Sequence, residues 1–329
     1  MLNPKLFLNA KVFDADVEQK ATRDGFGKGI VALGEKNSDV VVLSADLTES
    51  TRCEEFSKKF PERFFEVGVA EQNMAIVAAG LAVSGKIPFI SSYATFSPGR
   101  NWEPIRTTIV YNNVNVKVAG HHAGIMTGPD GATHQATEDI SSVRSWPGMD
   151  IVVACDAIEA EKSTIAEGER IGPAYLRFSR DKTPLMTTEA TPFVLGKVQQ
   201  FWISDNPQVT LFATGYMLFY ALLAAKELEE ENIQTIVVNV ATIKPLDQQG
   251  ILESIQVSKA AVTVEDHQVM GGLGGALAEL FGKTTPIPME FIGLQDTFAE
   301  SGKPIEIIEK YHMGKTAIKE AVKKVLQRK

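Results

Sequence analysis

The sequence predicts an α/β protein in which a doubly wound, mostly parallel sheet is followed by a smaller α/β domain. Short β-branched runs alternate with longer helical segments along most of the chain, which is the rhythm of strand–helix–strand units. These runs are apolar almost throughout rather than at every second residue, as expected of parallel strands buried on both faces. A chain of 329 residues also exceeds the usual size of a single core, so two domains are expected.

The first domain is predicted over residues 1–190. Its strands are expected, in chain order, at 39–46, 63–68, 86–92, 114–120 and 149–156. Its helices are expected around and between them, at 21–36, 71–84, 102–112 and 156–168. Ligands of such sheets gather at the carboxyl ends of the strands, and the unusual polar residues described below follow these strands.

The second domain is predicted over residues 191–329. The pattern first breaks at 181–208, a segment with three prolines and no helical period that we interpret as an interdomain linker. Strands are then expected at 209–215, 235–240 and 260–266. Helices are expected at 216–231, 246–257, 272–282 and 314–327.

The composition argues against several classes of partner. A formal net charge of −8 disfavours nucleic acid and anionic membranes, which attract basic surfaces. The two cysteines, Cys53 and Cys155, are far apart and have no metal-like or redox spacing, which is typical of a reducing compartment. Neither a secretory signal pattern nor an apolar run of about 18 residues is visible. A cytoplasmic protein is therefore expected.

Glu71 stands at the predicted start of the very apolar helix 71–84. No lysine or arginine lies within four positions of it. Capping is one interpretation, because acids near a helix N-terminus interact favourably with the dipole and the free amides. The apolar continuation suggests instead a buried helix start, where an unpaired carboxylate is costly and often functional.

The segment GHHAGIMTGPDGATHQATED, residues 120–139, contains three of the five histidines and four glycines. A zinc site of His121, His122 and His134 lacks a fourth ligand at helical spacing and is disfavoured. A purely structural loop is a second interpretation. The third is an active-site loop, since a glycine-rich segment that follows a parallel strand and is dense in titratable groups is where such sites form.

Other polar and aromatic residues have plain structural interpretations when taken singly. Arg23 begins a predicted helix, where a cation opposes the dipole and favours an anion nearby. Asp46 is a candidate helix cap, and Phe96 is a candidate core residue. Arg177 and Arg180 follow a strand and would ordinarily form surface salt bridges.

Two nucleotide-binding motifs are missing. GGLGGALAEL, residues 271–280, does not have the G-x-G-x-x-G spacing, so we reject NAD binding and interpret its glycines as helix-packing positions. No G-x-x-x-x-G-K-[ST] occurs, which excludes a P-loop.

Taken together, these segments resemble the pyrimidine-binding domain of transketolases. The resemblance covers about residues 20–182, and the remainder looks like the family's C-terminal domain. It rests on EVGVAEQNMAIVAAGLAVSGKIPFISSYATF and GHHAGIMTGPDGATHQATEDISSVR, with ATRDGFG, SADLTES and YLRFSRD in the family's order. The paired histidines and DGATHQ narrow the match from thiamine diphosphate enzymes at large towards transketolase.

The family's diphosphate-binding domain is missing from the sequence. That domain holds Mg²⁺ through a G-D-G motif, which does not occur here, and the chain is roughly half as long as a full transketolase. The resemblance therefore implies the C-terminal subunit of a split transketolase. Thiamine diphosphate would be shared with an N-terminal partner chain that holds the Mg²⁺, in an α2β2 assembly, and this chain would supply no metal ligand.

The resemblance also implies roles for individual residues. Glu71 matches the glutamate that hydrogen-bonds N1′ of the cofactor's aminopyrimidine, and Phe96 matches the aromatic residue that stacks on it. Trp102 lies where the family keeps further aromatics, although SPGRNW, which also contains Arg100, is shorter than the family's pattern. Catalytic roles are implied for Glu71, His122 and His134. Substrate-binding roles are implied for Arg23, Asp46, Ser50, His122, Asp130, His134 and Arg180.

The implied reaction transfers a two-carbon ketol unit from a ketose phosphate to an aldose phosphate, as in the pentose phosphate pathway. Histidines suit its proton transfers because their unperturbed pKa lies near neutrality. The alternatives are 1-deoxyxylulose-5-phosphate synthase, the beta subunit of a 2-oxo acid dehydrogenase, a non-catalytic assembly subunit and a metal hydrolase that uses the three histidines.

Overall fold

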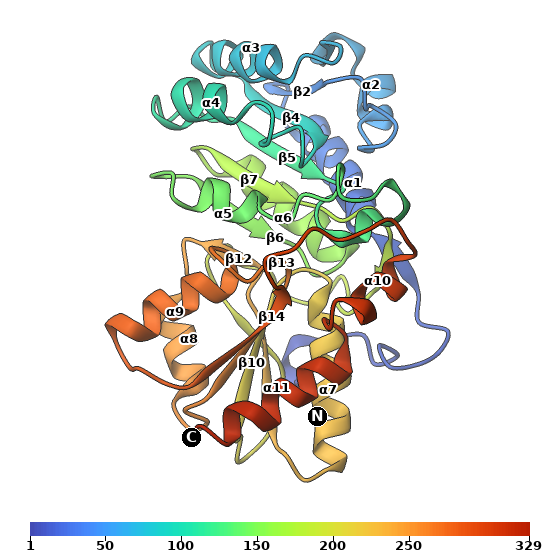
Figure 1. The fold of residues 1–329 in the computed structure, drawn as a ribbon. Helices are drawn as coiled ribbons and strands as arrows, with labels where there is room; N and C mark the ends of the chain where they lie inside the picture. Colours follow the sequence, from blue (N-terminus) through green and yellow to red (C-terminus); the bar gives the residue numbers. More distant parts are fainter.

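The computed structural model describes all 329 residues as two α/β domains, one above the other in Figure 1. This arrangement confirms the predicted fold class. Both domains contain mostly parallel sheets flanked by helices, and they are packed directly against each other. No helix is both long and apolar enough to cross a membrane.

The N-terminal domain is built on a seven-stranded sheet of order β12-β6-β7-β5-β4-β2-β3. All of its strands except β12 run parallel to their neighbours. These parallel strands are β2 Val40–Ser44, β3 Phe64–Glu66, β4 Ile87–Tyr93, β5 Lys117–His121, β6 Asp150–Val153 and β7 Ala174–Arg177. Five of them match the predicted strands, and β7 is an additional strand inside the sheet.

Helices cover both faces of this sheet, because successive strand residues point in opposite directions. Val40 and Val42 of β2 pack with Phe26 in one core, whereas Val41 and Leu43 pack with Met74 in the other. The first core contains residues of α1 Thr22–Lys36, α2 Glu54–Lys59 and α6 Ala157–Glu169. The second contains residues of α3 Glu71–Val83, the π-helical segment η3 Ile105–Val110 and α5 Asp139–Arg144.

One predicted helix has a different form. Residues 102–112 begin as the short α4, Trp102–Pro104, and continue as η3. Pro104 lies in the first turn of this helix, where a missing backbone N–H breaks no intrahelical hydrogen bond, so the proline does not account for the π-helical continuation. The remaining short segments are the 3-10 helices η1 Pro4–Leu6, η2 Pro61–Arg63 and η4 Ile125–Asp130.

The C-terminal domain has a five-stranded sheet of order β14-β13-β10-β11-β9, in which only β9 is antiparallel. Its strands are β9 Gln199–Trp202, β10 Val209–Ala213, β11 Thr235–Asn239, β13 Ala261–Gln268 and β14 Met289–Leu294. Its helices are α7 Met217–Glu230, α8 Gln248–Ile255, α9 Leu273–Lys283, α10 Pro304–Lys310 and α11 Lys315–Leu326. Neither β14 nor α10 was expected from the sequence.

The segment interpreted as a linker is structured. It contains β8, Lys182–Pro184, which pairs with β1, Gln19–Ala21, and it also contains β9. Proline is compatible with such edge positions, where a strand need not donate every N–H. The segment 181–208 thus runs from the first domain into the second, but it includes two short strands rather than being irregular throughout.

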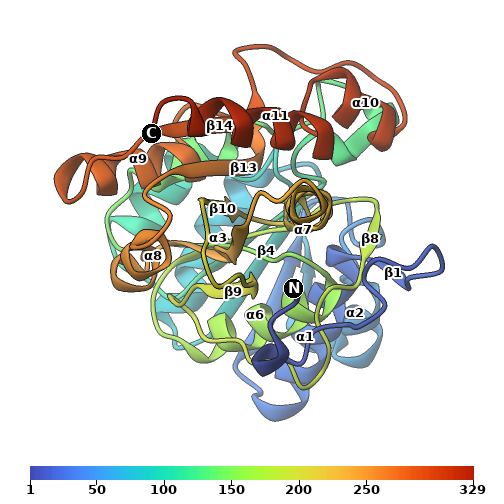
Figure 2. The same cartoon turned by 90° about the horizontal axis from the view of Figure 1, so that it is seen from below.

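Strand pairing and apolar packing hold the two domains together, in addition to the chain that connects them. β12, Thr242–Lys244, leaves the C-terminal domain and pairs antiparallel with β6 at the edge of the first sheet. Apolar residues of both domains form one continuous core, which includes Met74 and Val118 on one side and Phe212 and Leu277 on the other. Figure 2 shows α8 and α9 on one side of the C-terminal sheet and α7 and α11 on the other.

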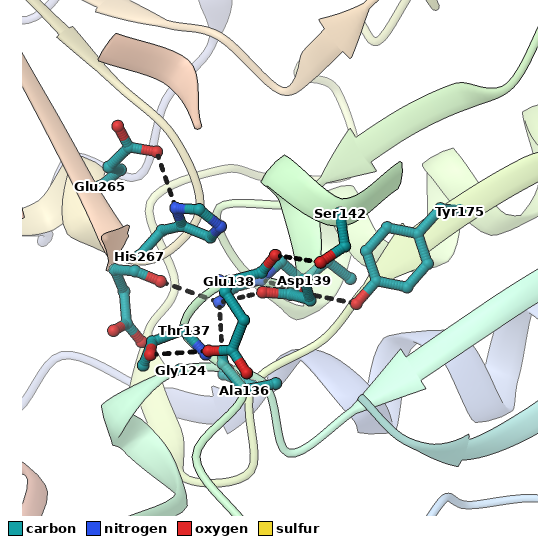
Figure 3. Close-up of polar contacts among 12 residues, drawn as sticks. Gly124, Ala136, Thr137, Glu138, Asp139, Ser142, Tyr175, Glu265 and His267 are labelled. Atoms are coloured by element: carbon teal, nitrogen blue, oxygen red, sulfur yellow. Dashed lines mark hydrogen bonds and ion pairs between the residues drawn. The ribbon is translucent and has the colours of Figure 1, made fainter. Parts of the chain in front are cut away.

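A buried polar network also crosses the domain interface. Arg177, at the end of β7, donates from Nε to Asp139 Oδ2 at 2.7 Å and from Nη2 to the carbonyl of Asp266 at 2.8 Å. Tyr175 donates to the same Asp139 oxygen at 2.5 Å. Figure 3 shows Asp139 facing Tyr175, with His267 of β13 nearby. Burial is the largest single influence and would raise the pKa of Asp139, but the charge of Arg177, a smaller effect of His267 and the hydrogen bonds from Arg177 and Tyr175 together hold this pKa below its usual value.

Arg177→Met should therefore destabilise the whole chain strongly, because it leaves the Asp139 carboxylate buried without its cation. We expect the free energy of unfolding in urea to fall by about 3–5 kcal/mol. Lys58→Met is the matched control, since Lys58 forms an exposed ion pair within α2 and its loss should have no measurable effect. Equal stability of the two variants would contradict a central role for Arg177.

Candidate active site

The polar residues singled out in the sequence converge at one edge of the first sheet. Asp46 follows β2, Glu71 follows β3, Phe96 follows β4, His122 follows β5 and Arg180 follows β7. These five strands are contiguous and parallel, so their carboxyl ends lie at the same edge. That edge is where α/β sheets bind ligands.

Glu71 is the first residue of α3, and its side chain is only 1% exposed. It is not unpaired. Arg100 donates from Nη1 to both carboxylate oxygens of Glu71 at 2.8 Å. The expectation that only a ligand would pair with this carboxylate was therefore wrong, because Arg100 comes from a loop 29 positions along the chain.

An aromatic wall stands beside this ion pair. The Arg100 guanidinium lies 4.6 Å from the ring centroid of Phe96. Tyr93 stacks on His122 at a centroid distance of 3.8 Å and lies 5.8 Å from Phe96. His134 meets Phe96 edge-on at 5.5 Å. The two histidines and Phe96 are thus brought together, and Tyr93, which the sequence reasoning missed, lies between them.

The adjacent histidines have different environments. His121 is fully buried between Phe26 and Phe178, at centroid distances of 4.7 and 5.1 Å, so its ring belongs to the core. His122 contacts the aromatic wall instead. Because the two rings do not converge, the arrangement does not support zinc binding by the histidine pair, and no other cluster of His, Cys, Asp or Glu could hold a metal ion.

The site is electropositive. Burial and then the charges of Arg23 and Arg180, with smaller contributions from His134 and Arg52, lower the pKa of His122 to about 3. The expectation of a histidine that titrates near neutrality is wrong for His122, which is a neutral imidazole at physiological pH. Arg52 was not singled out in the sequence, where nothing distinguished it from an ordinary surface arginine.

Protein groups leave part of this site unsatisfied. Arg23 donates from Nη1 to the carbonyl of Ser50 at 2.7 Å, but its buried Nε has no partner. The buried Nδ1 of His122 also lacks one. Arg180 donates to the carbonyl of Thr127 at 3.1 Å and is otherwise free of ion pairs. These donors and acceptors are available to a polar ligand.

Two of the candidate residues have strained backbones. Asp46 has φ = 60° and His122 has φ = 51°, in the left-handed region that side chains other than glycine rarely adopt. Such strain persists where the surroundings enforce it and is common at functional sites. The Asp46 amide donates to Glu66 Oε1 at 2.7 Å, which fixes the turn and leaves the Asp46 side chain exposed.

The remaining candidate residues are Asp130, His134 and Trp102. Asp130 is exposed at the end of η4, and His134 Nδ1 lies 2.9 Å from Thr133 Oγ1. Trp102 differs from expectation. Its Nε1 donates to the carbonyl of Ser142 at 3.1 Å, and its ring packs on Trp146 at 5.2 Å. Trp102 is thus held against α5 rather than against Phe96.

Comparison with known proteins shows the family of both domains. The family model of the transketolase pyrimidine-binding domain matches residues 18–186, and that of the transketolase C-terminal domain matches residues 200–318. A protein of Methanocaldococcus jannaschii described as a transketolase C-terminal section is 42% identical over 89% of this chain and 92% of its own length. A 6-deoxy-6-sulfo-D-fructose transketolase subunit of Clostridium sp. is 36% identical over 96% of this chain and 98% of its own.

A solved structure is also similar. The structure of a split gene transketolase, described as an inactive β4 tetramer, shares 42% identity and superposes with a TM-score of 0.87. The match covers 93% of this chain and 98% of that one. The chain therefore belongs to the transketolase family, and both of its domains match domains of that family.

Proposed function

We propose that this chain is the C-terminal subunit of a two-chain transketolase that transfers a two-carbon ketol unit from a ketose phosphate to an aldose phosphate. One observation carries the proposal. A buried carboxylate, a half-buried aromatic ring and a neutral histidine lie together at the carboxyl edge of a parallel sheet, surrounded by arginines.

The residues fit the aminopyrimidine end of thiamine diphosphate. Glu71 is 1% exposed, and a hydrogen bond between its carboxyl group and a ligand would be strengthened by the exclusion of water. Phe96 offers an aromatic face beside it. Thiamine diphosphate, when bound, supplies the nucleophilic carbon that breaks and re-forms the carbon–carbon bond. Glu71 would hold the proton shared with the ring nitrogen N1′.

We assign the diphosphate and Mg²⁺ to an N-terminal partner chain, in an α2β2 assembly. Two relatives support this assignment, because one is described as a C-terminal section and the other as a subunit. A surface of α3 offers a place for a partner. Ile76 and Val83 are 52% and 77% exposed, and a side-chain atom at Gly80 would meet nothing within 4 Å. An apolar face this open on a helix that begins with Glu71 is typical of an interface.

The anion of the substrate would bind to the arginines. Arg23, Arg52 and Arg180 together create the positive field at His122. A guanidinium presents a planar fork of donors that suits phosphate. A sulfonate has similar oxygen geometry, and the Clostridium relative is named for a sulfonated sugar. We propose phosphorylated sugars for this chain, with Asp46 and Asp130 as acceptors for sugar hydroxyls.

The decisive assay combines xylulose 5-phosphate and ribose 5-phosphate with thiamine diphosphate and Mg²⁺. The chain is tested alone and with a candidate N-terminal partner. Release of glyceraldehyde 3-phosphate only when both chains are present would support the proposal. Activity of the chain alone would contradict the assignment of the diphosphate and Mg²⁺ to a partner chain. Consumption of pyruvate without ketol transfer would assign the chain to another thiamine diphosphate reaction.

Glu71→Ala should reduce kcat of the assembled enzyme by about a hundredfold or more, because the proton held at the cofactor ring is lost. Assembly with the partner, measured by size-exclusion chromatography, should be unchanged. Glu103→Ala, at an exposed position with no ion pair, is the control and should keep full activity. Full activity in Glu71→Ala would remove Glu71 from the mechanism.

Arg180→Ala should raise KM for phosphorylated sugars by about tenfold while kcat changes little, because one charge-assisted contact to the phosphate is lost. The KM for glycolaldehyde, an acceptor without phosphate, should stay the same. Lys182→Ala, two positions along and exposed, controls for general loss of positive charge. An unchanged KM for ribose 5-phosphate in Arg180→Ala would exclude Arg180 from the phosphate site.

The lowered pKa of His122 predicts a specific acid sensitivity. The imidazole titrates near its ordinary value of about 6.5 in the unfolded chain and near 3 in the folded one. Between these values the unfolded state binds more protons, so the free energy of unfolding falls as the pH is lowered through this window. His122→Gln should make that fall shallower between pH 6.5 and 4, as measured by urea unfolding. His312→Gln, at an exposed position, is the control and should keep the wild-type dependence of the free energy of unfolding on pH. The same dependence in wild type and both variants would contradict the prediction.

A further inference from the structure

Arg100 occupies the two groups that the proposed function assigns to the cofactor ring. Its Nη1 donates to both oxygens of Glu71 at 2.8 Å, and its guanidinium carbon lies 4.6 Å from the Phe96 ring centroid. One planar, cationic group therefore satisfies the buried carboxylate through its edge and covers the aromatic ring with its face. An aminopyrimidine bound by Glu71 and Phe96 would use the same carboxylate and the same ring face.

We propose that Arg100 is a built-in placeholder that closes the aminopyrimidine site of the free subunit and swings out when thiamine enters. This inference rests on the proposed function. In the closed state Arg100 compensates the Glu71 charge, and in the open state a proton shared between the Glu71 carboxyl group and the ligand's ring nitrogen takes over that role.

The exposure of the two partners determines which of them moves. The Arg100 side chain is 48% exposed, whereas that of Glu71 is 1% exposed. Arg100 can return its charge to water by rotating its side chain, at little desolvation cost. Glu71 begins α3, and its backbone carbonyl accepts a bond from Asn101 Nδ2 at 3.1 Å, so the carboxylate stays in place. The adjacent Gly99 is exposed as well, which leaves space on the solvent side.

The closed state has an energetic reason. A buried carboxylate without a partner is strongly unfavourable, so the free subunit is more stable with Arg100 in the site. The same contact lowers the apparent affinity for a ligand by the fraction of molecules that are open. The placeholder thus protects the buried charge of Glu71 before assembly and delays loading of the cofactor.

The test is calorimetric titration of thiamine into the full chain alone, together with titration of thiamine diphosphate and Mg²⁺ into its complex with the partner. Four proteins are compared: wild type, Arg100→Met, the double variant Arg100→Met/Glu71→Gln and Arg106→Met. Arg106 is an exposed arginine six positions along the chain without an ion pair, so it controls for loss of charge.

We expect Arg100→Met to bind thiamine about tenfold more tightly than wild type, as when a closed state populated to about nine parts in ten is removed. The double variant should lose this gain, and Arg106→Met should bind like wild type. Without ligand, the Tm of Arg100→Met should be lower than that of wild type, and thiamine should raise it by more. This combination separates a placeholder from a structural ion pair, which would change Tm without tightening binding.

Two outcomes would overturn the inference. Measurable binding by wild type with equal or weaker binding by Arg100→Met would show that Arg100 does not compete with the ligand, and would leave the proposed function intact. Absence of binding by every variant, both alone and with the partner, would overturn the proposed function and the placeholder with it.

Discussion

The buried contact between Arg177 and Asp139 is the constraint on which the rest of the site depends. Arg177 ends the strand β7 at the centre of the first sheet and donates to Asp139, to the carbonyl of Ala136 and to the carbonyl of Asp266. Strand, glycine-rich loop and C-terminal domain are therefore held by a single guanidinium. Because the group is buried, water cannot replace any of these bonds, and the three parts keep one relative position.

The C-terminal domain shapes the active-site loop without placing a residue among the candidate catalytic groups. Asp266 Oδ1 accepts the amide of Ile125 at 3.0 Å, and the Gln268 amide donates to the carbonyl of Thr137 at 2.7 Å. Both ends of the segment that contains His122 and His134 are thus fixed from β13. A side-chain atom at Gly124 would lie 1.8 Å from Asp266 Oδ2, and its φ of 73° already favours glycine. The sequence of this loop is therefore constrained by the second domain.

Much of the fold follows from local sequence patterns, whereas the contacts that define the site do not. Continuous apolar runs predicted the parallel strands, and the start of the helix at Glu71 was correct to the residue. The pairing of β12 with β6 and the salt bridge between Arg100 and Glu71 join distant segments, which no periodicity reveals. Residue type alone also could not tell the role of His121 from that of His122. Adjacent residues at the end of a strand point to opposite faces of the sheet, so the two rings have different surroundings.

The candidate active site is positively charged, whereas the chain as a whole carries a net negative charge. The chain as a whole is acidic, yet burial and then the arginines around His122 hold its pKa far below neutrality. A neutral imidazole both donates and accepts hydrogen bonds, so His122 can orient a sugar hydroxyl or carbonyl without adding a charge that must be neutralised. The positive charge then remains on the arginines, and proton transfer is left to other groups. In the proposed function, attraction of an anionic substrate and movement of protons are in this way assigned to different side chains.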